Sequence, residues 1–162
     1  SRSLTEFSYR IAEGKTAQIF MGVEVSNNND RELLTAEIKK GGFDCHDLSN
    51  DELSKVHLRH MVGGRLPRSI SQISKEEYTE LLYRFEFPER PGALMRFVYS
   101  MRPEWTISIF HYRNHGADTG RIVIGVLVND SEIQAWNEFV KKIGYKNWDE
   151  TDNPAYKLFL GA

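Results

Sequence analysis

An internal repeat constrains the fold of this chain more than any other feature of its sequence. Pairs of segments match in the same order at an almost constant offset of 102 or 103 residues. Ordered matches at a fixed offset indicate two copies of one structural unit, and such copies usually pair about an approximate twofold axis. A ligand can bind at the interface that they share. The matches are Phe7-Ser8-Tyr9-Arg10 with Phe110-His111-Tyr112-Arg113, Gly22-Val23-Glu24-Val25 with Gly125-Val126-Leu127-Val128, Gly42-Phe43 with Gly144-Tyr145, and Asp47 with Asp149.

The composition predicts a soluble globular protein with one or two small domains. Hydrophobic residues make up 40% of the 162 residues, which is enough to bury a core. The formal net charge of -2 gives no excess of positive charge to attract nucleic acid or an anionic membrane, so neither is an expected partner. The single Cys45 excludes an intrachain disulfide framework and a thiolate zinc cluster, which favours a reducing compartment.

The second copy begins with the pattern of a ferredoxin-like β-α-β-β-α-β unit. Alternating apolar residues predict a strand over residues 81–87, and an i, i+3, i+4, i+7 stripe predicts a short helix over residues 94–101. Two β-rich runs, residues 105–110 and 121–128, are joined by a segment with the turn residues of a hairpin. These runs are the expected second and third strands.

The second copy continues with a helix and a last strand. Apolar spacing predicts the helix over residues 131–143, with Ser131 as its N-cap and Gly144 at its end. Residues 156–160 are the expected final strand. Two helices on one face of an antiparallel sheet place this unit in the α+β class.

The first copy has the second half of this order but not the first half. Residues 4–11 and 19–25 are predicted strands, residues 30–40 a helix, and residues 56–62 take the place of the final strand. No counterpart of residues 81–104 precedes them, so we expect the chain to be a carboxy-terminal piece of something longer. The truncated sheet should have an unpaired edge, which favours a homo-oligomer.

The predicted fold is therefore α+β, with two ferredoxin-like units of which the first is truncated at its N-terminus. The first unit spans residues 1–64 and the second spans residues 80–162. Residues 65–79 between them are polar and contain Pro67, which is typical of a linker.

Several segments, covering essentially the whole chain in order, resemble the regulatory region of biosynthetic threonine deaminase (threonine dehydratase). That region contains two ACT-like subdomains, which fits the duplicated ferredoxin-like units. The segments are Leu4-Thr5-Glu6-Phe7-Ser8-Tyr9-Arg10, His57-Leu58-Arg59-His60-Met61-Val62-Gly63-Gly64-Arg65, Phe85-Glu86-Phe87-Pro88-Glu89-Arg90-Pro91-Gly92-Ala93-Leu94 and Phe110-His111-Tyr112-Arg113.

The resemblance implies an allosteric role in isoleucine biosynthesis. In that family a pyridoxal phosphate (PLP) catalytic domain precedes the regulatory region and converts threonine to 2-oxobutanoate and ammonia. Isoleucine binds the regulatory region as a feedback inhibitor, and valine opposes it. The implied partners of this chain are L-isoleucine, L-valine and the catalytic domain, and the chain alone is expected not to be an enzyme. The implied compartment is the cytoplasm, or the plastid stroma in a plant.

The resemblance also places effector-binding positions on Tyr9, Tyr112, Arg59 and Arg113. These residue types suit a free amino acid, because an α-carboxylate binds guanidinium or backbone N–H donors and an aliphatic side chain packs on an aromatic ring. The start of the predicted helix at residues 91–93 offers such N–H donors, and Glu6 or Glu89 offers acceptors for the ammonium group. The predicted ligand-binding residues are Tyr9, Arg10, Arg59, Glu89, Pro91, Gly92, Ala93, Tyr112 and Arg113.

Each of these assignments has a structural alternative. The two tyrosines can be half-buried sheet residues, Arg10 and Arg113 can pair with acidic side chains, and the Pro91-Gly92 turn can serve only to start a helix. The module can also serve assembly or dimerisation without binding an effector. A metal-dependent or nucleophilic enzyme is a third reading.

The third reading has little support in the sequence. His57 and His60 lie three residues apart on a predicted strand, which would place them on opposite faces and disfavours a metal site with His46. Cys45 and His46 are neighbours in the sequence, which is a poor geometry for a nucleophile and its base.

Overall fold

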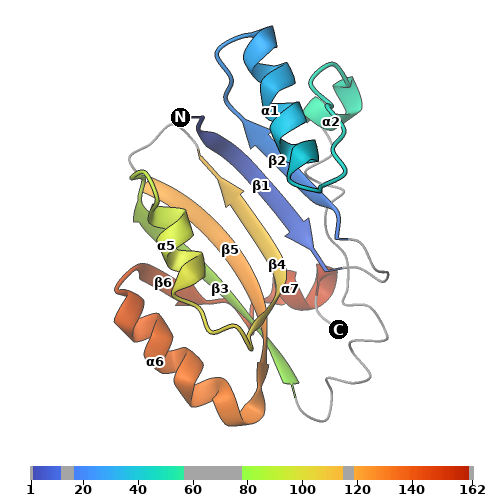
Figure 1. The fold of residues 1–162 in the computed structure, drawn as a ribbon. Helices are drawn as coiled ribbons and strands as arrows, with labels where there is room; N and C mark the ends of the chain where they lie inside the picture. The colour runs from blue at the N-terminus through green and yellow to red at the C-terminus, as the bar shows by residue number, and fades with distance from the viewer. Residues whose placement is uncertain (1, 12–16, 57–77, 115–118, 161–162) are drawn as a thin grey trace.

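A single antiparallel sheet of six strands, in the order β2-β1-β4-β5-β3-β6, runs through both copies (Figure 1). The computed structural model describes residues 2–11, 17–56, 78–114 and 119–160. No helix in this described part of the chain is long and apolar enough to cross a membrane. The strands are β1 (Leu4–Arg10), β2 (Ile19–Val23), β3 (Tyr78–Pro88), β4 (Thr106–Arg113), β5 (Thr119–Asn129) and β6 (Lys146–Asp149).

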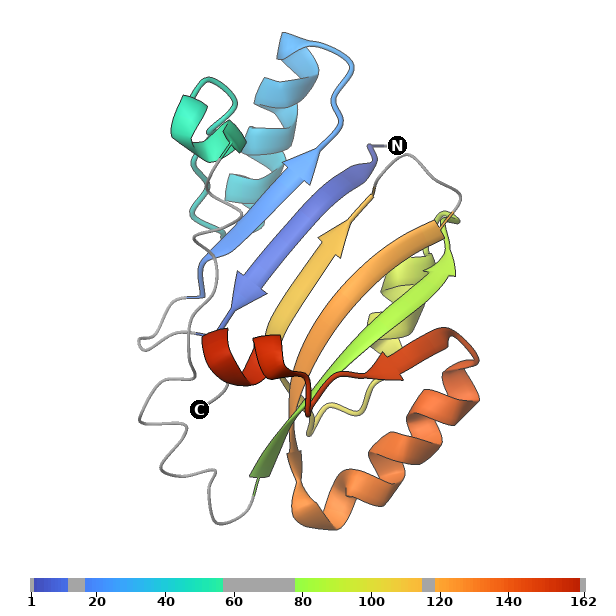
Figure 2. The ribbon, with the colours of Figure 1, turned by 180° about the vertical axis from the view of Figure 1, so that it is seen from behind.

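Three helices, α1, α5 and α6, cover one face of the sheet, here called the front face (Figure 1). Helix α7 lies on the opposite, back face, which is turned toward the viewer in Figure 2. The helices are α1 (Asn28–Lys40), α2 (Glu52–Val56), α5 (Ala93–Tyr99), α6 (Ile133–Ile143) and α7 (Pro154–Phe159), with a 3-10 turn, η1 (Asp130–Glu132), before α6.

The two copies meet where β1 pairs with β4, and this seam has the twofold symmetry that the repeat predicts. In the antiparallel register Phe7 stands opposite Tyr112 and Tyr9 opposite Phe110. Two equivalent hydrogen bonds extend the ladder beyond each end: Ile11 N–H donates to the Ser108 carbonyl at 2.8 Å, and Asn114 N–H donates to the Thr5 carbonyl at 2.9 Å. The repeated segments therefore pair with each other across the centre of the sheet.

The equivalence extends beyond the strands of the seam. With the same offset, β2 and α1 of the first copy correspond to β5 and α6 of the second. The short helices α2 and α7 correspond as well, and each follows a turn of the same kind. In these turns Ser49 N–H donates to Asp47 Oδ1 and Thr151 N–H donates to Asp149 Oδ1, both at 2.9 Å. The predicted pair of ACT-like, ferredoxin-like units is confirmed.

The main core lies between the front face and helices α5 and α6. Odd-numbered residues of β3 and even-numbered residues of β5 point into it, as the period of two for a strand requires. Aromatic residues dominate, and many of their rings meet edge to face; one example is Trp105 with Trp136, whose ring centroids are 5.1 Å apart. The second copy thus supplies most of the buried apolar surface, and Leu4, Phe7 and Tyr9 of β1 pack against its margin.

The prediction of a final strand over residues 156–160 is wrong, because this segment contains the end of helix α7. The side chain of Asn153 accepts a hydrogen bond from Ala155 N–H, and Pro154 occupies the first turn, where its missing N–H costs nothing. The last strand is β6, which starts two residues after Gly144. Gly144 ends α6 in the left-handed conformation with φ of 69° and returns the chain directly to the sheet.

Smaller differences concern helix starts and the linker. Ser131 is not the N-cap of α6: it lies within η1, and its N–H donates to the side chain of Asn129 at 3.0 Å. Strand β3 begins at Tyr78, inside the expected linker, whose residues 65–77 lie outside the described part. Val56 ends α2, and the rest of the first copy's expected final strand, residues 57–62, also lies outside the described part.

The packing at the seam can be tested by the stability of a variant. Phe110 is 5% exposed and meets Phe7 edge to face, with ring centroids 5.6 Å apart. We expect Phe110→Ala to lower the free energy of unfolding by about 3–5 kcal/mol, because it leaves a cavity at the contact between the copies. Urea denaturation measures the change. Leu33→Ala, at a side chain that is 52% exposed, is the control and should cost less than about 0.5 kcal/mol; equal costs would contradict a packed seam.

Candidate functional site

The sheet separates each repeated tyrosine from the arginine that follows it. Tyr9 and Tyr112 point to the front face and pack against or into the main core. Arg10 and Arg113, one residue later, point to the back face, because successive side chains of a strand alternate. The predicted ligand residues therefore do not form one cluster around a single ligand.

On the front face, a hydrogen bond joins two of the predicted site residues, Tyr112 and Glu89. The Tyr112 hydroxyl donates to Glu89 Oε1 at 2.9 Å, and the tyrosine is 2% exposed. Burial raises the pKa of Tyr112 to about 12, and the adjacent Glu89 carboxylate contributes, since both disfavour a phenolate. At neutral pH this hydroxyl is a fixed donor to Glu89.

The second oxygen of the Glu89 carboxylate is a buried acceptor without a donor. Glu89 Oε2 finds no hydrogen-bond partner among the residues that the structure describes. Gly120 of β5 makes room for it, because a Cβ atom at that position would lie 2.6 Å from Oε2 and 2.9 Å from the Phe87 ring. A buried carboxylate oxygen normally accepts a hydrogen bond, so this atom is suited to a donor from outside the chain.

The turn before α5 lies next to Glu89 in the sequence and contains three predicted site residues. Gly92 has φ of 79°, a left-handed conformation that favours glycine, and both Pro91 and Gly92 are exposed. The Ala93 N–H donates to the Arg90 carbonyl at 2.9 Å, so this donor is used within the turn. The turn therefore presents less free N–H than the sequence suggested.

Tyr9 lies across the seam from the Tyr112–Glu89 pair. It is partly buried at the margin of the main core, directly opposite Phe110 in the ladder. Burial raises its pKa, although the neighbouring Arg10 opposes this shift. The two tyrosines thus flank the Phe7–Phe110 contact at the centre of the seam.

On the back face, Arg10 belongs to a buried polar cluster that joins the two copies. Its guanidinium forms an ion pair with Glu80 of β3, and the two side chains are 3% and 6% exposed. The hydroxyls of Ser108 and Tyr156 also donate to the Glu80 carboxylate, and Arg10 Nη2 donates to the Leu160 carbonyl at 3.1 Å. Burial and Glu80 raise the pKa of Tyr156 above its ordinary value, so its hydroxyl stays a donor.

This buried cluster supports the structural alternative for Arg10, because its charge is compensated within the fold. Its role in ligand binding stays a prediction. Arg113 is partly exposed at the end of β4, where Glu6 stands opposite it on β1 and Arg121 on β5. Arg59 lies outside the described residues.

Sequence reasoning missed the residues that shape both clusters. Glu80, Ser108 and Tyr156 come from three separate elements, and no local pattern connects them. Gly120 falls in the segment predicted as the hairpin turn, but the structure places it in β5, where a glycine allows a close approach of neighbouring groups.

The described residues do not suit PLP or a metal ion. PLP binds enzymes through a lysine in a protected site, whereas every lysine whose burial the structure describes is exposed. In the described part of the chain, no group of three His, Cys, Asp or Glu residues is arranged to hold a metal. No chemical step is therefore assigned to either group.

The hydrogen bond between Tyr112 and Glu89 predicts that the stability of the fold depends on pH. In the unfolded chain Tyr112 ionises near the ordinary tyrosine pKa of 10.0, but in the fold its pKa is about 12. The stability from this hydroxyl is therefore complete below pH 10 and declines as the pH rises through 12. We expect Tyr112→Phe to cost about 1–3 kcal/mol at neutral pH and progressively less in alkali. Urea unfolding at a series of pH values measures this difference.

The control for this pH effect is Tyr99→Phe, because Tyr99 is 78% exposed. Its cost should be near zero at every pH. A cost of Tyr112→Phe that stays constant up to about pH 12 would contradict the assigned ionisation.

Comparison with known proteins agrees with the fold. Residues 1–58 and 72–160 match the family described as the C-terminal regulatory domain of threonine dehydratase. The chain is 46% identical over 159 residues to the L-threonine dehydratase biosynthetic IlvA of Burkholderia multivorans, and 43% identical over 162 residues to that of Escherichia coli. It is 39% identical over 161 residues to the mitochondrial threonine dehydratase of Schizosaccharomyces pombe.

The three alignments cover 98%, 99% and 98% of this chain but only 30%, 30% and 25% of the relatives. The chain thus spans less than a third of the length of these proteins. Since both the family match and the identities extend over almost all of its residues, the chain belongs to the family of C-terminal regulatory domains of threonine dehydratase.

Proposed function

We propose that this chain is an effector-binding module that reports isoleucine and valine levels to a threonine dehydratase catalytic domain. The catalytic chemistry and its PLP belong to that domain, and this chain supplies no catalytic residue. Isoleucine is the inhibitor and valine the opposing effector, as the family resemblance implies. The observation that carries the proposal is the Glu89 Oε2 atom, a buried acceptor without a donor among the described residues.

Glu89 Oε2 suits the ammonium group of a free amino acid. An ammonium carries three N–H donors and a full charge, and a charge-assisted hydrogen bond to a buried carboxylate is among the stronger polar contacts. Tyr112 holds the other oxygen at 2.9 Å, so the carboxylate is oriented before the ligand arrives. Preorganisation of this kind lowers the entropic cost of binding.

The aliphatic side chain of the effector would pack on the front face of the seam. Tyr9 and Phe7 are only partly buried there, and they form an apolar margin beside the core. Arg59 is the basic residue that the resemblance offers for the α-carboxylate. Arg113 lies on the opposite face at the last residue of β4, so it would contribute only to a ligand that extends around this end of the strand.

Selectivity between the two effectors is expected to depend on conformation as well as on contacts. Isoleucine and valine differ by one methylene, which is worth about 1–3 kcal/mol in a hydrophobic pocket. Opposite regulatory effects require that the two ligands favour different states of the protein, since a ligand shifts an equilibrium only by its differential affinity.

The test is calorimetric titration of the chain with L-isoleucine, with L-valine, D-isoleucine and L-serine as comparators. We expect saturable heat for the branched L-amino acids only. Glu89→Gln should weaken isoleucine binding about tenfold or more, because the amide still accepts the Tyr112 hydrogen bond but presents no charge to the ammonium.

The matched control is Glu86→Gln, which removes a carboxylate three residues earlier in the chain, near the end of β3. Glu86 pairs with Arg121 at 3.3 Å and Lys146 at 3.4 Å on the back face, so isoleucine binding should not change. Unaltered affinity in Glu89→Gln would remove Glu89 from the site. Absence of heat with a demonstrably folded sample would argue for the assembly role instead.

A further inference from the structure

Gly120 of β5 borders the Glu89 carboxylate, and its missing side chain decides where that carboxylate can lie. A Cβ atom at Gly120 would lie 2.6 Å from Glu89 Oε2 and 2.9 Å from two carbon atoms of the Phe87 ring. Both distances are shorter than the 3.0 Å below which real Cβ atoms are essentially never found. A methyl group at this position would therefore displace the carboxylate, the ring or both.

The surroundings of the carboxylate are fixed, so Glu89 is the part that would move. Gly120 stands opposite Phe87 in the ladder of β5 with β3, and Phe87 is 2% exposed. The Tyr112 hydroxyl donates to Glu89 Oε1 at 2.9 Å from a residue that is also 2% exposed. Close-packed rings of this kind resist displacement, whereas the end of a glutamate side chain rotates readily. A methyl group at Gly120 would thus break the hydrogen bond between Tyr112 and Glu89.

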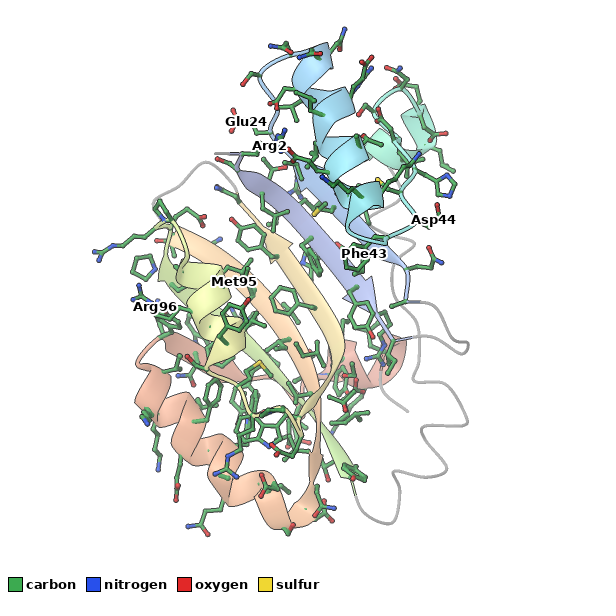
Figure 3. The ribbon with its side chains drawn as sticks, viewed as in Figure 1. Arg2, Glu24, Phe43, Asp44, Met95 and Arg96 are labelled. Atoms are coloured by element: carbon green, nitrogen blue, oxygen red, sulfur yellow. The ribbon has the colours of Figure 1, made fainter. Side chains whose placement is uncertain are left out.

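No partner within the described part of the chain determines the position of Glu89 Oε2. This atom has no hydrogen-bond partner there. Helix α5 follows Glu89 in the sequence, and its residues Met95 and Arg96 are exposed (both are labelled in Figure 3). The Arg96 N–H donates to the Gly92 carbonyl at 2.9 Å, so this donor is used within the helix start. The shape of β5 at Gly120 therefore fixes where Oε2 lies.

A methyl group is present at the equivalent place of the first copy. Ala17 lies 103 residues before Gly120, and the same offset relates β2 to β5. Each of the two residues lies two positions before the isoleucine that stands opposite the repeated tyrosine, Tyr9 or Tyr112. A carboxylate that lay against Ala17 as Glu89 lies against Gly120 would collide with the Cβ atom. The two tyrosines are therefore equivalent in the ladder but not in the space beside them.

We propose that Gly120 positions the Glu89 carboxylate for the ammonium group of the effector and confines ammonium recognition to the second copy. This inference rests on the effector-binding function proposed above. Gly120 is a positioning residue, because it has no side chain of its own to contact a ligand and acts through Glu89. Ala17 excludes the same arrangement in the first copy, so the ligand environments of the two tyrosines differ.

A double-mutant cycle by calorimetric titration with L-isoleucine tests this role. Gly120→Ala should weaken binding about tenfold or more, because it removes the Glu89 carboxylate from its place beside the ammonium. In a Glu89→Ala background, where no carboxylate remains to be displaced, Gly120→Ala should change the affinity less than about twofold. A comparable loss that persists in this background would overturn the proposal, since it would come from the fold or from Phe87.

The stability of the folded chain gives a second readout that needs no ligand. The cost that Tyr112→Phe has in the wild type should disappear in Gly120→Ala, because the hydroxyl has already lost its acceptor. Urea denaturation at neutral pH measures both costs. An unchanged cost would overturn the positioning role, whereas absence of isoleucine heat from the folded wild type would contradict the proposed function. If Gly120→Ala does not fold, Phe87→Leu removes the ring atoms nearest to the new Cβ and serves as the background for both cycles.

The reciprocal variant tests the restriction to the second copy. Ala17→Gly removes the methyl group of the first copy and should leave the isoleucine affinity unchanged, because the ammonium is bound at Glu89. We expect a single bound isoleucine per chain to depend on Gly120. A pair of equivalent isoleucine sites that are both lost in Gly120→Ala, or a changed affinity in Ala17→Gly, would overturn this restriction.

Discussion

The antiparallel pairing of β1 with β4 is the interaction on which the rest of this structure depends. It joins the two copies into one sheet, and its register places the repeated segments opposite each other about a local twofold axis. Once this register is set, strand alternation decides which side chains meet: the tyrosines share the front face with the main core, and the arginines share the back face. A shift by one residue would exchange these faces, so the faces of Tyr9, Arg10, Tyr112 and Arg113 follow from this one ladder.

Much of the fold could be predicted from the repeat, because an offset carries information from one copy to the other. The repeat predicted β1 and β4 at the seam, the neighbouring strands β2 and β5, and the helix that ends at Gly144. The final strand was misplaced, because residues 156–160 contain apolar and aromatic residues that suit a strand or a short helix. The decisive local signals are the cap at Asn153 and Pro154 in the first turn, which favour a helix.

The candidate site could be predicted only in part. Tyr112 and Glu89 do come together, which the sequence suggested through the chemistry of the ligand. The grouping of each tyrosine with its following arginine could have been questioned from sequence alone, since neighbours on a strand face opposite ways. The partners of Arg10 could not be found in this way. Glu80 lies 70 residues away, and their contact depends on the missing side chain of Gly125.

Two glutamates of the second copy, both at least partly buried, differ in how fully their carboxylates are hydrogen-bonded. The Glu80 carboxylate receives donors from Arg10, Ser108 and Tyr156 on both oxygens, so it has no capacity for a ligand and serves the contact between the copies. Glu89 receives one donor, from Tyr112, and its other oxygen is buried without one in the described part of the chain. An unsatisfied buried acceptor lowers the stability of the fold. This cost remains at Glu89, whereas at Glu80 the three donors remove it. This difference is the reason that the proposed effector site is placed at Glu89, since a ligand that donates to its second oxygen would recover on binding what the empty protein gives up.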